Sequence, residues 1–476
     1  MSDMLSLGQT LQWLARARLV DPSGCSHDTR FCRVHTDSRS LAPGDLFVAL
    51  RGERFDGNDF LLEAKARGAV AAVCQGDAES RLQAAGLAGL IVADTRLALA
   101  ELATRWRAQF TLPLVAVTGS NGKTTVTQMI AAIFRAFRPD AFLATQGNFN
   151  NDIGVPLTVL RLRAGHQLAV VELGMNHPGE IATLAAIAQP SVALVNNAQR
   201  EHLEFMSSVA AVAQENGAVI DALAAAGVAV FPSDDAFSAV WQAKAGLRTT
   251  LQFGLADAAV ADVRCSAAQW SGQAWQVSAQ TPLGPVQYSL PVAGWHNVKN
   301  SLAALSCALA AAVPLSAIAQ GLSTFEAVKG RSRAQLLSVA GRRITLVDDS
   351  YNANPDSVSA AIEMLASLPA PRLLVLGDMG EVGDQGPKFH AQAGAHARRR
   401  GIDALFALGE LSQAAARAFG EGNHFGDMAA LQQAVQARLG GFASVLVKGS
   451  RFMRMECVVA SITACESSNE GKEYAV

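Results

Sequence analysis

The 476 residues of this chain exceed what one hydrophobic core usually serves, and a prior of about 150 residues per domain suggests about three domains. Half of the residues are hydrophobic and only 17% are charged, which is typical of a compact α/β enzyme and excludes a disordered or fibrous chain. The formal net charge of −2 gives no general attraction to polyanions, so we expect no nucleic-acid partner.

The cysteines and the apolar stretches indicate a cytoplasmic protein. Seven scattered cysteines form no CxxC pair, which disfavours a disulfide framework and a zinc site. The N-terminus has no basic segment followed by an apolar run, so we expect no signal peptide. Residues 300–325 carry no charge and are long enough to span a bilayer, but Pro314 and Gly321 interrupt them. We therefore predict one or two buried helices there and no stable membrane insertion.

The first 110 residues alternate short apolar runs with turn signals and are predicted to form a small N-terminal α/β domain. Helices are expected near 61–68 and 97–109, with strands at 69–74 and 90–92. The polar end of the second helix, near Gln109, gives the predicted boundary of a domain spanning 1–110.

From residue 112 a strand, a Gly-rich turn and a helix-length segment recur. Continuous apolar strands of this kind indicate a doubly wound parallel sheet covered on both faces. Residues 249–291 switch to alternating polar segments, which predicts an antiparallel excursion within a central domain spanning 111–328. The predicted parallel strands are 114–117, 168–171, 192–195 and 228–230.

A second α/β series follows Gly330 and predicts a Rossmann-like C-terminal domain spanning 329–476. Residues 467–476 are polar and aperiodic, so we expect a frayed tail. The predicted strands are 344–347, 373–376, 404–407 and 445–447.

A phosphate-binding loop is predicted at 118–125, between the first strand of the central domain and a helix. Glycine lets backbone N–H groups turn toward phosphate oxygens, and the helix N-terminus adds partial positive charge. Lys123 can reach the outer phosphates, and the hydroxyl of Thr124 can bind Mg²⁺. The GxxxxGK[ST] spacing is incomplete because Val117 stands where the first glycine would be. A Gly-rich turn with a surface lysine is the structural alternative.

Further motifs accompany this loop in all three predicted domains, and together they resemble the Mur ligases of peptidoglycan synthesis. The motifs keep the family's order along the chain. They are QGNFNNDIGVP at 146–156, ELGMNHPGE at 172–180, HNVKN at 296–300, DDSYNANP at 348–355 and LGDMGE at 376–381.

The resemblance implies an N-terminal domain that binds the UDP end of the substrate, a central ATPase domain, and a C-terminal domain that closes on ATP and the incoming dipeptide. The motifs look most like the step that joins D-alanyl-D-alanine to UDP-N-acetylmuramoyl-tripeptide. Transfer of the ATP γ-phosphoryl group to the tripeptide carboxylate would give an acyl phosphate, which the amine of the dipeptide attacks. Elementary chemistry agrees, because a carboxylate is a poor electrophile at neutral pH and phosphorylation supplies a leaving group.

Two Mg²⁺ ions are implied by the resemblance, with Thr124, Glu172 and His202 as ligands. Glu172 ends an apolar strand, at the sheet edge where ligands of doubly wound folds collect. Imidazole is an unusual ligand for magnesium, and a lone histidine is more often solvated or satisfied within the fold. The implied catalytic residues are Lys123, Glu172, His202 and Arg331.

The resemblance also assigns ATP contacts outside the phosphate loop. Asn297 and Asn300 stand three residues apart on a predicted helix and so share a face, where their amides can bond the adenine, although Asn297 can also cap the helix. Arg331 resembles the arginine that contacts phosphate on closure, and Asp349 the carboxylate that binds the ribose. The complete implied set is Gly119, Ser120, Asn121, Gly122, Lys123, Thr124, Thr125, Asn297, Asn300, Arg331 and Asp349.

Substrate contacts are implied in each domain. Ser38 and Arg39 match a segment that faces the UDP-sugar, with a surface turn as the structural alternative. The segment 352–355 also suits a turn that begins a helix. The implied substrate residues are Ser38, Arg39, Asn150, Asn151, Tyr351 and Asn352.

One position departs from the family pattern. Many Mur ligases carry a carbamylated lysine where this chain has Asn216, which provides only a neutral carbonyl. Glu215 and Glu204 are the candidates for the missing negative charge, with a water bridge from Asn216 as the alternative, and we expect activity independent of bicarbonate. A second departure, Asn58 in place of a common histidine, is expected to change only a local hydrogen bond.

Two other functions stay open from the sequence. The first is a different Mur-type or folylpolyglutamate-type amide ligase, and the second is a nucleotide-binding regulatory protein without catalysis. The joint presence of Lys123, Glu172 and His202 argues against the second. A monomer is expected, and whether the third residue of the peptide is diaminopimelate or lysine is not predicted.

Overall fold

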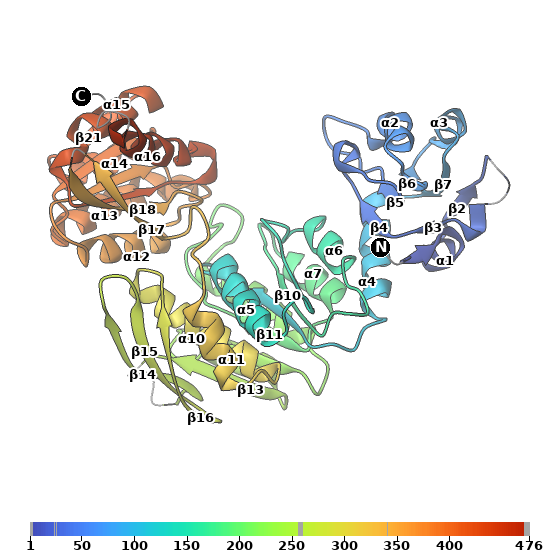
Figure 1. The fold of residues 1–476 in the computed structure, drawn as a ribbon, viewed down its shortest axis with the longest axis horizontal. Helices are drawn as coiled ribbons and strands as arrows, with labels where there is room; N and C mark the ends of the chain where they lie inside the picture. The colour runs from blue at the N-terminus through green and yellow to red at the C-terminus, as the bar shows by residue number, and fades with distance from the viewer. Residues whose placement is uncertain (1–2, 23, 25, 256–259, 340, 471–476) are drawn as a thin grey trace.

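The chain folds into three α/β units arranged in chain order, as the computed structural model in Figure 1 shows. The structure describes residues 3–22, 24, 26–255, 260–339 and 341–470. Each unit is built on its own main sheet, and the sheets contain five, nine and six strands. The predicted fold class is thereby confirmed, whereas the exact domain boundaries stay predictions.

The N-terminal sheet has the order β2-β7-β6-β5-β4, with β2 antiparallel to β7 and the other pairs parallel. The helix α4 (Thr95–Arg107) leaves this sheet and packs against the central unit, where the Trp106 indole donates to the carbonyl of Leu162. The remaining elements are β1 (Leu5–Ser6), α1 (Leu7–Trp13), β2 (Arg18–Val20), β3 (Arg30–Phe31), β4 (Arg33–His35), β5 (Asp45–Val48), α2 (Leu61–Ala66), β6 (Ala71–Gln75), α3 (Glu79–Ala85) and β7 (Ala88–Val92).

The central sheet has the order β16-β15-β14-β13-β12-β11-β8-β10-β9 and is parallel from β9 to β14. Its elements are β8 (Leu114–Thr118), α5 (Lys123–Phe137), β9 (Phe142–Ala144), α6 (Gly154–Val159), β10 (Leu168–Glu172), α7 (Glu180–Ala188), β11 (Val192–Val195), α8 (Val209–Asp221), β12 (Val228–Pro232), α9 (Ser238–Ala245), β13 (Thr249–Gly254), β14 (Val263–Trp270), β15 (Trp275–Thr281), β16 (Gly284–Leu290), α10 (Trp295–Ala310) and α11 (Leu315–Ser323).

Both faces of the central sheet are buried, which explains the continuous apolar strands. Along β8, Leu114 and Ala116 face one core, and Val115 and Val117 face the other. The first core lies under α6, α7 and α8, and the second under α5, α10 and α11. Because β8 lies between β10 and β11, the loop that follows it emerges at the middle of the parallel sheet.

The C-terminal sheet has the order β17-β18-β22-β19-β20-β21 and is parallel except for β17. The carboxyl ends of β18, β19 and β22 face the central unit, so the loops after them help to form the site. The elements are β17 (Arg333–Val339), β18 (Arg342–Asp349), α12 (Pro355–Ala366), β19 (Arg372–Gly377), α13 (Gly386–Arg399), β20 (Ala404–Leu408), α14 (Gln413–Phe419), β21 (Asn423–Phe425), α15 (Met428–Arg438), β22 (Ser444–Lys448) and α16 (Glu456–Glu470).

Three local expectations changed or were confirmed. The antiparallel excursion is shorter than predicted, because β13 pairs parallel with β12 and only β14, β15 and β16 form antiparallel pairs. Residues 300–325 form parts of the buried helix α10 and of α11, as predicted. The expected frayed tail was wrong up to Glu470, which is still helical, and 471–476 lie outside the described residues. Within the described part of the chain, no helix has the length and apolarity needed to cross a membrane.

Candidate active site

A cavity of about 1270 Å³ lies between the central and C-terminal units. Residues of both units line it, from the phosphate loop on one side to the ends of β18, β19 and β22 on the other. The predicted residues in its wall are Ser120, Asn121, Gly122, Lys123, Thr124, Thr125, Asn150, Asn151, Glu172, His202, Asn297, Asn300, Arg331, Asp349, Tyr351 and Asn352.

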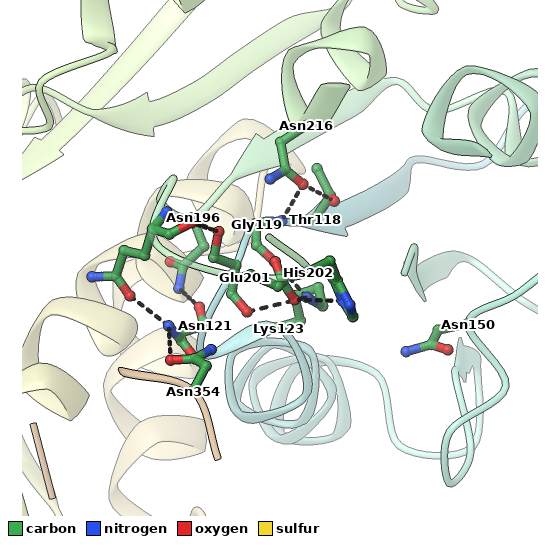
Figure 2. A network of polar contacts seen from close by, with 12 residues as sticks. Thr118, Gly119, Asn121, Lys123, Asn150, Asn196, Glu201, His202, Asn216 and Asn354 are labelled. Atoms are coloured by element: carbon green, nitrogen blue, oxygen red, sulfur yellow. Dashed lines mark hydrogen bonds and ion pairs between the residues drawn. The ribbon is translucent and has the colours of Figure 1, made fainter. Parts of the chain in front are cut away.

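Asn216 on α8 holds the start of the phosphate loop, as Figure 2 shows. Its side-chain oxygen accepts hydrogen bonds from Thr118 Oγ1 at 2.7 Å and from the Gly119 N–H at 3.0 Å. The residue is fully buried and does not line the cavity. The expectation of a water bridge from Asn216 toward a metal therefore finds no support, because its carbonyl is engaged by the loop itself.

The two acidic candidates for the missing charge are also placed elsewhere. Both carboxylate oxygens of Glu215 accept from backbone N–H groups at the start of α7, those of Gly179 and Ile181, each at 2.9 Å. Glu215 is thus committed to capping that helix. Glu204 is exposed, and neither residue lines the cavity.

Neighbouring groups already use the first N–H groups of the loop. Those of Ser120 and Asn121 donate to the backbone and side-chain oxygens of Asn197, at 3.1 and 2.9 Å. The loop is therefore held in place by Asn197. The N–H groups of Ser120 and Asn121, which the sequence predicted to be free for phosphate, already have acceptors. The first turn of α5 begins at Lys123 and supplies the positive end of the helix dipole. The N–H groups of Lys123, Thr124 and Thr125 have no backbone partner among the described residues.

Gly122 requires glycine at the turn into α5. Its φ of +83° lies in the left-handed region, and a Cβ there would meet Asn300 Oδ1 at 2.5 Å and Asn196 Nδ2 at 2.7 Å. Any side chain at this position would push the loop away from α10. The glycine of the Gly-Lys-Thr motif is thus required by close packing and by its backbone conformation.

Lys123 points back along the loop. Its ammonium group donates to the carbonyls of Gly119 and Ser120 at 2.6 and 3.2 Å, and it pairs with Glu201 Oε1 at 2.7 Å. Only 14% of the lysine side chain and 10% of the Glu201 side chain are exposed. The lysine ammonium group is thus held beside the cavity, where Glu201 balances its charge until an anionic ligand competes for it.

His202 lies between two carboxylates from different units. Its Nε2 is 3.4 Å from Glu201 Oε1, and its Nδ1 is 2.5 Å from Glu381 Oε2. Burial lowers the pKa of His202, but the two carboxylates outweigh burial and raise that pKa to about 9. Both ring nitrogens are thus engaged by carboxylates, and the assignment of His202 to a second Mg²⁺ stays a prediction.

Glu172 fits a cation site better. Its side chain is 1% exposed, and Asn150 Nδ2 donates to Oε1 at 2.7 Å. Within the described residues, the second buried oxygen, Oε2, has no hydrogen-bond partner. Carboxylate and hydroxyl oxygens are the ligands that Mg²⁺ prefers, so Glu172 and Thr124 would hold the ion. The described residues contain no cluster of three His, Cys, Asp or Glu side chains suited to a metal.

Asn297 and Asn300 share a helix face, as predicted, and bond each other at 3.0 Å. Asn300 Oδ1 also accepts from Asn196, which donates at the same time to the Asn121 carbonyl at 2.8 Å. Asn297 does not cap α10, because the N-cap residue is Gly294. These buried amides therefore couple α10 to the phosphate loop.

Asp349 is half-buried and forms an ion pair. Its Oδ2 is 2.6 Å from Lys448 Nζ, and its Oδ1 accepts from the Ser332 N–H at 2.9 Å. Burial alone would raise the pKa of Asp349, but Lys448 outweighs it and lowers that pKa. Beside this pair, the Arg331 guanidinium lies 4.1 Å from the centre of the Tyr351 ring.

Polar contacts cross the cavity between the two units. Arg200 forms bidentate contacts with Asp356, the shortest at 2.6 Å. Figure 2 shows a second contact, in which Asn354 Nδ2 donates to Asn121 Oδ1 at 2.9 Å. Asn354 is also the N-cap of α12, and Pro355 follows it, so the predicted turn that begins a helix is confirmed. The phosphate loop and the C-terminal unit are thereby in direct contact.

The N-terminal pair Ser38 and Arg39 does not line this cavity. Ser38 Oγ donates to Glu63 Oε2 at 3.3 Å, and the exposed Arg39 pairs with Asp37 at 2.8 Å. Hydrogen bonding from Arg39 lowers the pKa of Asp37 to about 2. Asn58 donates to the carbonyl of Gln75 at 2.9 Å, which agrees with the expected local role.

Sequence reasoning gave no role to several residues that complete the cavity. Glu201 and Asn196 follow β11, and Lys448 ends β22, so all three stand at the carboxyl ends of parallel strands. Ligands of doubly wound sheets bind at the carboxyl ends of the strands, so this position could have identified the three residues from the sequence. The other residues missed are Gln199, Asn354, Asp356, Glu381, Ser450 and Arg451.

Three protein-family models match the chain. The Mur ligase family, catalytic domain, matches residues 31–107, the Mur ligase middle domain matches 117–308, and the Mur ligase, glutamate ligase domain, matches 332–451.

Curated and solved relatives cover nearly the whole chain. The UDP-N-acetylmuramoyl-tripeptide--D-alanyl-D-alanine ligase of Escherichia coli is 42% identical over 431 residues, which are 90% of this chain and 93% of that protein. The crystal structure of MurF from Acinetobacter baumannii matches with a TM-score of 0.87 and 34% identity, over 98% of this chain and 99% of that one. MurF ligase from Thermotoga maritima in complex with ADP has a TM-score of 0.79 at 24% identity, over 92% and 98% of the two chains.

Proposed function

The chain belongs to the Mur ligase family, and we infer that it is the ATP-dependent ligase that joins D-alanyl-D-alanine to UDP-N-acetylmuramoyl-tripeptide in peptidoglycan synthesis. The observation that carries this function is the 42% identity over 90% of the chain with a ligase of that name. The product is the UDP-linked pentapeptide. A folylpolyglutamate-type activity is the weaker alternative, because a folylpolyglutamate synthase is similar in fold at only 16% identity.

We propose that the reaction proceeds through an acyl phosphate. The terminal carboxylate of the tripeptide attacks the γ-phosphorus, and the bond to the ADP oxygen breaks. The amine of the dipeptide then attacks the acyl carbon, phosphate leaves with the carbon–oxygen electron pair, and the nitrogen loses a proton. Because each step moves negative charge between oxygens, the chain needs fixed cations and donors around the reacting phosphate.

The phosphate loop and Lys123 are proposed to supply those groups. The first turn of α5 offers N–H donors, and Lys123 needs only to exchange its loop carbonyls for phosphate oxygens. Glu201 would keep the lysine directed along the loop, since Lys123 Nζ and Glu201 Oε1 are 2.7 Å apart. Arg331, next to Tyr351, is proposed to contact phosphate from the C-terminal unit.

Mg²⁺ is proposed to bind Glu172 and Thr124, and when bound it would neutralise charge on the phosphate oxygens. Asn150 holds the Glu172 carboxylate in place from the opposite side. A second ion at His202 stays a prediction, and it would require the imidazole to give up its contact with Glu201 or Glu381. A cytoplasmic location and a monomeric state also stay predictions.

The function is tested by following ADP release from purified protein with UDP-N-acetylmuramoyl-tripeptide and ATP. D-Alanyl-D-alanine is compared with D-alanine alone, and turnover is expected only with the dipeptide. Equal turnover with D-alanine would reject the assignment. ATP hydrolysis that needs neither peptide substrate would instead favour a regulatory nucleotide-binding protein.

A further inference from the structure

Arg331 stands on a strained turn of the linker between α11 and β17. The residues on either side of it both have positive φ angles, +78° at Gly330 and +53° at Ser332. Ser332 is buried and, unlike glycine, rarely adopts this left-handed conformation, so the surrounding structure must hold it there. Among the described residues, the Arg331 guanidinium has no hydrogen bond or ion pair. It lines the cavity and is therefore open to an anionic ligand.

Two consecutive carboxylates at the end of β18 hold this turn, one on each side of Arg331. On one side, Asp349 Oδ1 accepts from the Ser332 N–H at 2.9 Å and from Ser332 Oγ at 3.2 Å. On the other side, Asp348 Oδ2 accepts from the Gly330 N–H at 3.0 Å. Asp349 lines the cavity, whereas Asp348 does not. Asp348 can therefore influence the cavity only through the segments that it holds.

Asp348 is a buried carboxylate without a cation beside it. The residue is 2% exposed, and it forms no ion pair with any residue that the structure describes. Besides the Gly330 N–H on Oδ2, it accepts on Oδ1 from Ser350 Oγ at 2.6 Å and from the Ser350 N–H at 3.3 Å. A buried carboxylate needs such donors to compensate for the water that it has lost. The two oxygens of Asp348 thus join the linker to the segment that follows β18.

Each oxygen of Asp348 holds the residue that precedes a side chain of the cavity wall. Gly330 comes immediately before Arg331 in the sequence. In the same way, Ser350 comes immediately before Tyr351. The two segments are also joined to each other, because the Tyr351 N–H donates to the Gly330 carbonyl at 3.0 Å. These contacts support the stack in which the Arg331 guanidinium lies 4.1 Å from the centre of the Tyr351 ring.

We propose that Asp348 is a positioning residue that presents Arg331 and Tyr351 to the nucleotide phosphates as a preformed pair. It acts through the backbone of the two segments, since its own side chain does not reach the cavity. A long arginine side chain loses rotamer freedom when a ligand fixes it, and holding it beforehand reduces that entropic cost. The inference rests on the proposed ligase function and adds a residue on which the placement of Arg331 depends.

The role is tested with Asp348→Ala in two backgrounds, the wild-type chain and Arg331→Met, by measuring ADP release with both peptide substrates. Arg331→Met alone should lower kcat about 100-fold, the range for loss of one preorganised donor at a reacting oxygen. Asp348→Ala alone should lower kcat about tenfold, with the KM for the UDP-tripeptide within about twofold of wild type. Because Asp348 acts through Arg331, adding Asp348→Ala to Arg331→Met should lower kcat by less than about twofold more.

Asp348→Asn is the conservative variant. Its carbonyl can still accept from the Gly330 N–H while its amide donates to Ser350 Oγ, so only the 3.3 Å contact with the Ser350 N–H is lost. It should therefore keep kcat within about threefold of wild type. The control is Asp403→Ala, which removes a carboxylate that accepts from the Arg372 N–H at 2.7 Å in the same unit. Neither of these two residues lines the cavity, and kcat should not change.

Hydrogen exchange of the peptide that contains 326–334 tests the placement without any ligand. Asp348→Ala should speed exchange in this peptide about tenfold, because the Gly330 N–H loses its acceptor. Exchange in β20 should match wild type, which would show that the sheet remains folded. If Asp348→Ala does not fold, Ser350→Ala replaces it, since this variant removes only the 2.6 Å contact. Its effect on kcat should be about threefold and should show the same dependence on Arg331.

The proposed function and this inference fail in different ways. If the wild-type enzyme does not turn over the dipeptide at all, the ligase assignment fails. If it does, an equal loss of kcat from Asp348→Ala in both backgrounds would show that Asp348 supports only the fold, and would overturn the inference. A wild-type kcat in Asp348→Ala, or an effect confined to the KM of the UDP-tripeptide, would overturn it as well.

Discussion

Asn216 offers the sharpest test of how the phosphate loop is held. Its oxygen is the acceptor for both Thr118 Oγ1 and the Gly119 N–H, and all three groups are buried. Asn216→Leu keeps the approximate volume and removes the acceptor. Two donors then lose their partner inside the protein, and each costs about 1 to 3 kcal/mol.

Part of that cost is offset. The Asn216 Nδ2 atom is itself buried without a partner among the described residues, so leucine also removes an unsatisfied group. The net loss of local stability is then about 2 kcal/mol. Thr118→Val deletes one of the two stranded donors. Added to Asn216→Leu, it should recover about 1 kcal/mol, whereas in the wild-type background it should destabilise by about 1 kcal/mol.

Hydrogen exchange of the peptide that contains 114–126, followed by mass spectrometry, measures this local opening without requiring the whole chain to unfold in one step. Asn216→Leu should speed exchange about 30-fold, since about 1.4 kcal/mol corresponds to tenfold. The reasoning is refuted if exchange does not change, or if Thr118→Val destabilises equally in both backgrounds.

The other predictions concern catalysis and closure. Lys123→Met should lower the rate of ADP release by at least about 100-fold with an unchanged circular dichroism spectrum, and retention of near-normal turnover would contradict its role at the phosphates. Glu172→Gln should raise the Mg²⁺ concentration for half-maximal activity at least about tenfold, measured by titration, because a neutral amide is a weaker ligand. Activity of the wild-type enzyme should not change when bicarbonate is added, and a marked activation that Asn216→Ala abolishes would count against the neutral role of that residue. Asp356→Asn should weaken the contact with Arg200 and increase the radius of gyration in X-ray scattering without ligands; an unchanged radius would show that this pair does not hold the two units together.

The fold and the chemical class were predictable because they depend on local patterns. Strands buried on both faces must be apolar throughout, as β8 and β10 are, and only the strand-to-helix turn at 118–125 combines glycine, lysine and threonine in the order that phosphate binding needs. The shared face of Asn297 and Asn300 followed from helix periodicity alone.

The partners of the charged side chains could not be predicted, because they depend on distances between segments far apart in the chain. Lys448 pairs with Asp349, and Glu381 contacts His202. Each contact joins two elements that no local sequence pattern relates to one another. The partner of Glu215 could not be predicted either. Its neighbour Asn216 suggested that Glu215 supplies the missing negative charge near the metal, but its carboxylate caps α7. The sequence by itself determined the three α/β units and the types of groups that we propose to contact ATP. Only the tertiary structure decided which of those groups are free to bind, because neighbouring segments already satisfy many of them.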